Sequence, residues 1–502
     1  MAFISPSDIF IKHNIFPIKS YNPPSLHMPA IPPGARPFGA DSRSFRPDRM
    51  SCQESRKRFK IKIVKNAAII ILFLGILLFP LGASALNVKE YHLDNGLKVL
   101  ILEDHKAPTA TFQIWYRVGS VDEKIGKTGL SHLLEHMMFK GTAAYGPKTF
   151  SQTIQRAGGM DNAFTSRDYT GYFELLASDR IGIPIGMEAD RMRNLILTPQ
   201  AVLSERDVVM EERRLRYDDD PENLLHQEAL AAAFKDHPYR WPVIGWMSDL
   251  KTLDPADLVA HYNTYYEPNN AVIIVVGDVQ SDQVLAEIKK AFGSIPGGPE
   301  IKRTHPAEDA QYGEKRVYVK KEAELPSVLI VYKVPGIGDD DGLALDVLAG
   351  ILSGGKSSRL YHSLVYEKQI ALSAWASYEG LYRDPFLFYA AATAAHGKKI
   401  EDVERSLLDE VEKMKKDPPS EREVRKAKNQ IEASFVMDQD SIYMQARTIG
   451  SFEMAGGWRL IDRYLEGIRK VTAEDVRRVA AKYLVADRKT TGILIPEGKG
   501  KK

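Results

Sequence analysis

The segment LDPADLVAHYNTYYEPNNAVIIVVGD (residues 253–278) decides the fold, because a second segment of the chain repeats its pattern. It is typical of a capped helix, a turn at the Pro-Asn-Asn tripeptide and a buried strand. VTAEDVRRVAAKYLVADRKTTGILIPEG (residues 471–498) has the same order of features, and Asp257 and Asp475 occupy matching positions 218 residues apart. Such a repeat predicts two related units within one chain.

Each repeated segment lies at the end of one of the two units, and a strand-like run lies near the start of each unit. VLILED (99–104) and RVYVKK (316–321) are such runs, and a proline- and glycine-rich stretch (293–315) lies between the units. Two related α+β units are the simplest interpretation. We predict a first unit at residues 86–295, a linker at 296–312 and a second unit at 313–502.

The composition is that of an ordinary globular protein. Of the 502 residues, 44% are hydrophobic and 27% are charged, and the formal net charge is +2. A net charge this small gives no indication of a nucleic-acid partner.

The N-terminal part of the chain differs from the rest. Residues 1–49 are rich in proline and serine, so we expect disorder there, or a mis-annotated extension if translation starts at Met50. Residues 50–85 have the basic, apolar and Ala-x-Ala regions of a signal peptide, which predicts export to the periplasm. An uncleaved anchor in the inner membrane is the alternative. The single cysteine, Cys52, precedes the cleavage signal, so the mature chain has no catalytic cysteine.

The stretch GLSHLLEHMMFKGT (residues 129–142) holds His132, Glu135 and His136 within five positions. On a helix these three side chains point away from the stripe of leucines and methionines, which argues against ordinary core histidines. Two histidines one turn apart suit two ligand positions of Zn²⁺, and the glutamate beside them is placed as a general base. The alternative is a solvated polar helix face.

A catalytic zinc needs a third protein ligand from another element. SERDVVMEERRLRYDDDPE (residues 204–222) is typical of a helix that Ser204 could cap. Glu205 and Glu212 are seven residues apart and share a face, whereas Glu211 is turned about 100° away. A charged, solvent-exposed helix fits the spacing equally well.

The offset of 218 residues places Gly350, Ser353 and Gly354 at the positions of His132, Glu135 and His136. None of these three residues can act as the histidine or glutamate does. The second unit is therefore expected to serve shape, binding or assembly rather than metal chemistry.

His-x-x-Glu-His followed 76 residues later by a glutamate of a Glu-x6-Glu pair resembles the inverzincins. This is the pitrilysin/insulinase family, which includes insulin-degrading enzyme and the mitochondrial processing peptidases, and the likeness covers residues 90–495. It implies two homologous α/β-sandwich units, each an antiparallel-rich sheet with helices on one face. Together they would form one half of a clamshell, as in the short-subunit branch typified by the processing peptidase beta subunit.

The resemblance also implies an activity and a site. It implies a zinc metalloendopeptidase that hydrolyses peptides or unfolded polypeptide segments in a dimeric chamber, with one Zn²⁺ per chain. His132, His136 and Glu212 would be the ligands, Glu135 the base and Glu205 the carboxylate that orients a ligand histidine. Manganese or cobalt would be accepted by similar ligands.

A further likeness concerns the substrate. GGMDNAFTSRDYTGYFELL (residues 158–176) resembles the substrate-edge strand of the family, with Asn162, Ala163 and Phe164 at its start. An extended peptide can add to such an edge through its main chain. An ordinary internal strand would fit the second part of this stretch as well.

One departure from the family concerns the second unit. Active members carry an arginine and, seven residues later, a tyrosine there, whereas this chain has Val365 and Leu372 at the aligned positions. A homologous partner subunit that lacks the zinc motif would supply the missing pair in a heterodimer. Competing interpretations are a catalytically silent structural or assembly subunit of the same family, and a protein of metal storage or transport.

Overall fold

The computed structural model describes residues 86–303 and 307–498. The predicted N-terminal extension (1–49) and signal peptide (50–85) lie outside these residues. Within them, no helix combines the length and the apolar character that a membrane crossing requires.

The first half forms a six-stranded sheet in the order β1-β2-β6-β3-β5-β4. Its strands are β1 (Lys89–His92), β2 (Lys98–Glu103), β3 (Thr109–Tyr116), β4 (Met160–Thr165), β5 (Thr170–Ala177) and β6 (Ala271–Gly277). Its α-helices are α3 (Leu130–Met137), α4 (Thr149–Arg156), α5 (Gly182–Asn194), α6 (Pro199–Arg213), α7 (Pro221–Ala233), α8 (Met247–Leu250), α9 (Pro255–Tyr265) and α10 (Ser281–Phe292). Its short helices are η1 (Ser120–Asp122), η2 (Ser178–Arg180), the π-helix η3 (Arg214–Asp218), η4 (Pro238–Arg240) and η5 (Pro268–Asn270).

The second half forms a five-stranded sheet in the order β7-β11-β8-β10-β9. Its strands are β7 (Lys315–Glu322), β8 (Ser327–Val334), β9 (Ala371–Glu379), β10 (Phe386–Ala394) and β11 (Lys489–Glu497). Its helices are α11 (Asp340–Ser353), α12 (Ile400–Lys416), α13 (Glu421–Asp438), α14 (Ile442–Ala455), α15 (Leu460–Lys470) and α16 (Ala473–Tyr483), with η6 (Tyr361–Glu367) and η7 (Ala486–Arg488). Between α10 and β7 the described residues contain no helix or strand.

The two halves repeat each other as the sequence predicts. α9, η5 and β6 correspond to α16, η7 and β11, and each element begins 218 residues after its counterpart. Both helices start with a capping box, made by Asp254 with Asp257 and by Thr472 with Asp475. In each sheet one pair of strands is parallel, β2 with β6 and β7 with β11, and the other pairs are antiparallel. The predicted α+β fold class is confirmed.

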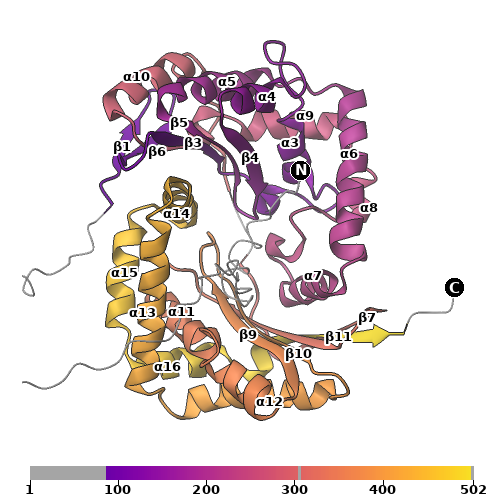
Figure 1. Cartoon of the computed structure of the whole chain (residues 1–502). Coiled ribbons are helices and arrows are strands. Elements are labelled where there is room, and N and C mark those ends of the chain that lie inside the picture. Colours follow the sequence, from indigo (N-terminus) through magenta and orange to yellow (C-terminus); the bar gives the residue numbers. More distant parts are fainter. Residues whose placement is uncertain (1–85, 304–306, 499–502) are drawn as a thin grey trace, which may run out of the picture. The chain divides into compact units, whose positions relative to one another are not determined.

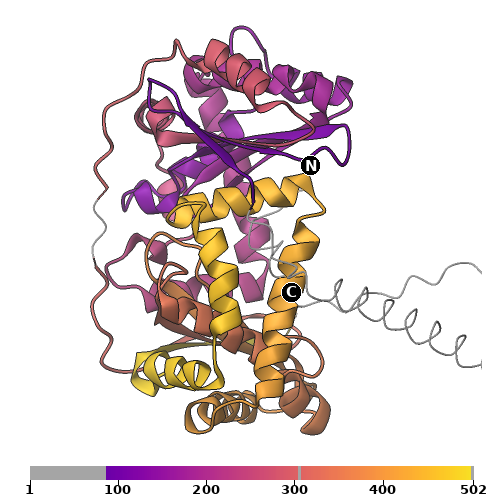
Figure 2. The ribbon, with the colours of Figure 1, turned by 90° about the vertical axis from the view of Figure 1, so that its left-hand side faces the viewer.

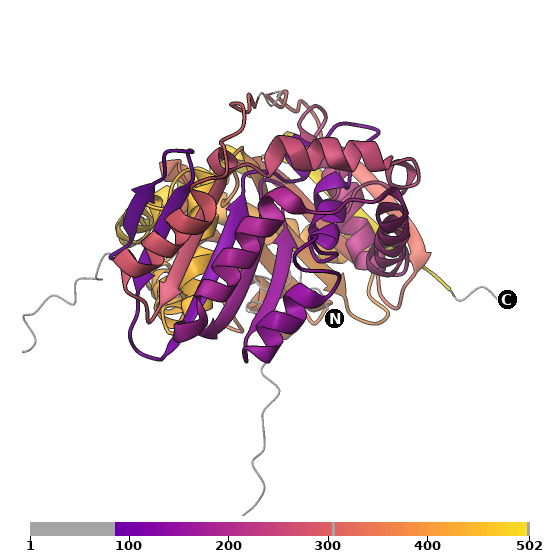
Figure 3. The same cartoon turned by 90° about the horizontal axis from the view of Figure 1, so that it is seen from above.

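Each sheet is covered by helices of its own half on one face, and Figure 3 shows those of the first sheet from above. The other face of each sheet receives one helix from the other half. α14 of the second half packs against β3 and β6, and α7 of the first half packs against β7, β8 and β11 (Figures 1 and 2). Two mixed apolar cores result, one around Trp115 and one around Tyr389. The halves are thus interlocked by an exchange of helices.

Two local expectations need correction. Ser204 does not cap a helix, because α6 begins at Pro199 with Thr198 as its N-cap, and Ser204 is exposed in the middle of that helix. A threonine cap followed by proline at the first helical position is a stronger start than a lone serine. The stretch 158–176 is a hairpin rather than one strand: β4 lies at the edge of the sheet, whereas β5 lies inside it.

Candidate active site

The structure brings His132, His136 and Glu212 together from two helices, α3 and α6. Glu212 Oε2 lies 3.2 Å from His136 Nε2, and Glu212 Oε1 lies 3.9 Å from His132 Nε2. One nitrogen or oxygen atom from each of the three residues lies within 4.8 Å of the other two. Among the described residues, this is the one group of three metal-binding side chains that converges in this way.

These distances suit a zinc ion. Zinc bonds of 2.0–2.1 Å in tetrahedral geometry separate neighbouring ligand atoms by about 3.4 Å, and the two distances from Glu212 to the histidines, 3.2 and 3.9 Å, lie on either side of this value. The imidazole rings lie edge to face, with centroids 4.8 Å apart. His132, Glu135 and His136 are 8%, 3% and 5% exposed, so a solvated helix face is excluded.

The first turn of α3 is fixed by a residue that the motif does not reveal. Buried Glu123 accepts hydrogen bonds from the backbone N–H groups of Gly129 and Ser131 at 2.8 and 2.7 Å. A carboxylate there satisfies donors that a helix start leaves without partners. Gly129 has φ +94°, and a Cβ at this position would lie 2.6 Å from the carbonyl oxygen of Ile244, so only glycine fits.

Glu205 lies where a carboxylate that orients a ligand histidine should lie. Its Oε1 is 3.0 Å from His136 Nδ1, and its other oxygen forms an ion pair with Lys140. The contact with Nδ1 leaves His136 Nε2 to face Glu212. Glu211, by contrast, is exposed and pairs with Arg214 at 2.6 Å, as the helical spacing predicts.

Glu135 is the second carboxylate of the site and is held from the sheet. The hydroxyl of Thr165, the last residue of β4, donates a hydrogen bond to Glu135 Oε2. Burial raises the pKa of the Glu135 carboxyl to about 7, although the hydrogen bond from Thr165 works in the opposite direction. A carboxyl group with a pKa near neutrality is suited to accept a proton and release it again.

The charges of two candidate ligands suit a divalent cation. Burial lowers the pKa of His132 to about 3, so its imidazole is neutral. Burial alone would raise the pKa of Glu212, but the hydrogen bond with His136 and nearby positive charges bring it down to about 2. One of these charges belongs to Arg216, whose Nη2 lies 2.9 Å from Glu212 Oε1. Arg216 lies in the π-helix after α6. From the sequence, its contact with Glu212 could be predicted only from the spacing of four residues between them.

The predicted substrate residues lie on β4, and no strand of the described residues pairs with the outer edge of β4. The backbone N–H of Ala163 donates to Oδ1 of Asn162 at 2.9 Å. Phe164 is buried, with the Arg447 guanidinium of α14 3.8 Å from its ring centroid. The edge strand β4 therefore belongs to the first half, and its Phe164 packs against α14 of the second half.

The second half lacks these groups, as the repeat offset predicts. Gly350 and Ser353 lie in α11, and Gly354 follows it. Val365 is partly buried against the apolar core of the second half, whereas Leu372 on β9 is 63% exposed. Neither offers a side-chain donor.

Comparisons with known proteins agree with this architecture. The sequence profile described as Insulinase (Peptidase family M16) matches residues 98–245, and that described as Peptidase M16 inactive domain matches residues 252–431. The chain is 32% identical to the zinc protease PqqE of Helicobacter pylori over 433 residues, which cover 84% of this chain and 97% of that protein. The crystal structure of a protease from Helicobacter pylori is similar with a TM-score of 0.78 and 31% identity, covering 82% of this chain and all of that one.

A more distant neighbour has the fold in a longer chain. The periplasmic protease PqqL from Escherichia coli matches with a TM-score of 0.68 and 18% identity, and the match covers 82% of this chain but 48% of PqqL. Homologues named zinc proteases suggest zinc as the metal, and the donor set described above suits it. The two profiles match this chain, and the likeness to PqqE extends over almost the whole length of that protein. The chain therefore belongs to the insulinase family, peptidase family M16.

Proposed function

We propose that this chain is a zinc metalloendopeptidase that cleaves peptides or unfolded polypeptide segments. The observation that carries the proposal is the convergence of His132, His136 and Glu212 beside a buried glutamate. Membership of a peptidase family supports the reaction class, and names of the relatives support the metal. Metal storage or transport would need the three ligands but would leave Glu135 without a role.

Each residue has a part in this chemistry. His132, His136 and Glu212 would hold the ion, which when bound supplies a Lewis acid that polarises the scissile carbonyl group. Glu135 takes a proton from the attacking water and later gives it to the leaving amine. Thr165 holds the Glu135 carboxylate, and Glu205 holds the ring of His136 in the orientation in which Nε2 faces Glu212 and would be available to the metal.

The substrate would bind as an added strand along the outer edge of β4. Strand addition uses main-chain hydrogen bonds, so it accepts many sequences and requires an extended, unfolded segment. Because Asn162 Oδ1 already accepts the N–H of Ala163, an incoming peptide carbonyl has to replace this side chain. Asn162 is therefore expected to move when a peptide binds.

A homologous partner subunit completes the proposed enzyme. Val365 and Leu372 stand where the family resemblance implies an arginine and a tyrosine, so a partner without the zinc motif would supply these donors in a heterodimer. PqqL, whose chain is about twice as long as the matched part, is consistent with two such halves acting together. We also propose export to the periplasm, with an uncleaved membrane anchor as the alternative.

The test is Glu135→Gln in the purified chain, assayed alone and with its co-purifying partner on an unfolded peptide. We expect zinc to stay bound at wild-type stoichiometry and turnover to fall by about a thousandfold or more, because the proton acceptor is lost. Glu211→Gln, an exposed neighbour on α6, serves as the matched control and should leave both unchanged. Equal behaviour of Glu135→Gln and wild type would favour a silent structural subunit or a metal carrier.

Full peptidase activity of the chain without any partner would refute the partner proposal while leaving the metallopeptidase proposal intact. A homodimer would contain the zinc motif twice and the missing donors not at all. Mixing the purified chain with its co-purifying partner therefore separates the two proposals.

A further inference from the structure

The loop between β9 and β10 in the second half reaches the hairpin that carries the edge strand. The backbone N–H of Arg383, in this loop, donates to Asp168 Oδ2 at 2.9 Å. Nη2 of Arg383 also lies 3.3 Å from Asp168 Oδ1 and 3.4 Å from its carbonyl oxygen. Asp168 is 2% exposed and belongs to the turn that joins β4 to β5.

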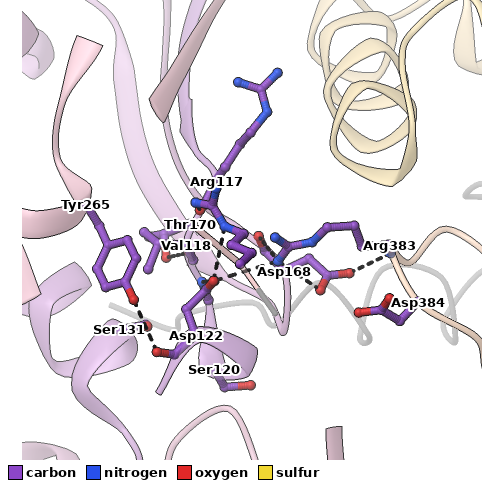
Figure 4. Close-up of polar contacts among 12 residues, drawn as sticks. Arg117, Val118, Ser120, Asp122, Ser131, Asp168, Thr170, Tyr265, Arg383 and Asp384 are labelled. Atoms are coloured by element: carbon purple, nitrogen blue, oxygen red, sulfur yellow. Dashed lines mark hydrogen bonds and ion pairs between the residues drawn. The ribbon is translucent and has the colours of Figure 1, made fainter. Parts of the chain in front are cut away.

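Arg383 has a second anionic partner in the first half. Its Nη2 lies 3.6 Å from Asp122 Oδ2, and Asp122 also accepts from Gly119 N–H at 3.1 Å and from Arg303 Nε at 3.2 Å. Figure 4 shows Arg383 beside Asp168 and, on the other side, Asp122. The hydroxyl of Tyr239 donates its one proton to the Asp168 carboxylate and lies 2.8 and 2.9 Å from its two oxygens. The guanidinium thus bridges two buried carboxylates.

The clamped turn is directly connected to the candidate catalytic base. Ser166 N–H bonds to the carbonyl of Tyr169 at 2.8 Å and closes the turn. The residue before the turn, Thr165, is the one whose hydroxyl donates to Glu135. A shift of the turn therefore changes both the end of the edge strand and the contact that holds Glu135.

The second half also contacts the strand itself. Arg447 of α14, 7% exposed, stacks on Phe164 of β4. The edge strand is therefore held from the second half both on its face and at its turn. An added peptide strand requires a fixed register of the strand it joins, and this register is weakly specified at a free edge.

We propose that Arg383 is a positioning residue, through which the half without the metal motif fixes β4 for the incoming peptide and Thr165 against Glu135. The inference rests on the proposed peptidase function. Arg383 forms no hydrogen bond or ion pair with the candidate ligands or with Glu135, so it acts through Asp168 and the turn, with Asp122 as its second anchor in the first half.

The competing explanation is that Arg383 merely joins the two halves, as other ion pairs do. Lys98 on β2 offers the matched comparison, because its Nζ lies 2.9 Å from Glu453 of α14 and this pair also crosses between the halves. β2 is separated from β4 by β6, β3 and β5 in the sheet. Removing the Lys98 pair weakens the junction without touching the hairpin turn.

The experiment compares Arg383→Met, Arg383→Lys and Lys98→Met in the zinc-loaded full chain with its partner. The first readout is hydrogen exchange of the β4 amides, which needs no activity. The second is kcat/KM for a peptide long enough to pair with all of β4 and for one too short to extend beyond Thr165. We expect Arg383→Met to speed exchange in β4 and to lower kcat/KM for the long peptide by about tenfold, mainly through KM.

Several outcomes decide the proposal. Lys98→Met should leave both readouts close to wild type, and Arg383→Lys should recover part of the loss because a cation still faces Asp168. Equal losses for the long and the short peptide, or equal effects of Arg383→Met and Lys98→Met, would overturn the positioning role. If the wild-type complex cleaves neither peptide, the peptidase proposal fails, and the exchange data alone still decide whether Arg383 fixes β4.

Discussion

Replacing Glu205 by glutamine tests how much the carboxylate that orients His136 contributes to metal binding. One oxygen of Glu205 lies 3.0 Å from His136 Nδ1 and the other pairs with Lys140. Glutamine retains an acceptor for Nδ1 but loses the negative charge, and its amide N–H₂ would face the Lys140 ammonium group. Loss of such a partner typically weakens metal affinity 10- to 100-fold, which corresponds to about 1.4 to 2.7 kcal/mol of binding free energy.

The assay is competition for Zn²⁺ between the purified chain and a chelator of known affinity, at fixed pH and ionic strength. Glu211→Gln is the control, because this neighbouring carboxylate is 60% exposed and pairs with Arg214 on the solvent side. We expect the control to bind zinc as wild type does and Glu205→Gln to release it at a lower chelator concentration. Equal zinc affinity of the two variants would refute the reasoning that Glu205 orients His136.

Three further predictions concern stability. Gly450→Ala should destabilise the chain by about 1–3 kcal/mol in denaturant unfolding, because its Cβ would lie 2.4 Å from the buried ring of Trp115. Gly186→Ala in α5 meets no atom within 4 Å and should stabilise the chain by about 0.5–1 kcal/mol; a loss of stability would contradict this. Burial raises the pKa of Asp346 to about 6, despite its hydrogen bond from Tyr464. Between about pH 4 and 6 the folded state then binds more protons than the unfolded state, so stability falls as pH rises. The unfolding free energy of Asp346→Asn should therefore rise relative to that of wild type as the pH increases from about 4 to 6. Above pH 6 the difference between the two proteins should remain constant, as measured by unfolding at each pH.

The sequence predicts those features that depend on local patterns repeated in the chain. The offset between Asp257 and Asp475 predicts two units, and both residues prove to be capping partners at the starts of equivalent helices. The spacing of Glu205, Glu211 and Glu212 correctly predicts that Glu205 and Glu212 share a face and that Glu211 points away from it, whereas the family resemblance supplied the expectation that this face meets α3. These predictions succeed because helical periodicity fixes side-chain direction over one or two turns.

Features that depend on competing caps, on irregular loops or on contacts between distant segments could not be predicted in this way. Ser204 suggested a helix start because serine is a common cap, but Thr198 and Pro199 begin the helix earlier. Glu123 lies in a loop without any motif, and only the fold brings it under the first turn of α3. The exchange of α7 and α14 between the halves is likewise invisible, because an amphipathic helix does not reveal which sheet it covers.

The exchange of α7 links the helix of the third candidate ligand to the second half. Glu212 lies in the last turn of α6, and only the π-helix η3 and residues 219–220 separate α6 from α7. α7 packs against β7, β8 and β11 of the second half, and Arg213, beside Glu212, donates to Gln227 of α7 at 2.8 Å. His132 and His136, by contrast, lie on α3, which is buried against the core of the first half. α6 itself packs against α3, with Val202 and Val209 in the core of the first half, so the fold of the first half brings Glu212 to the two histidines. The hydrogen bond from Arg213 to Gln227 adds a link from the last turn of α6 to the helix that covers the second sheet.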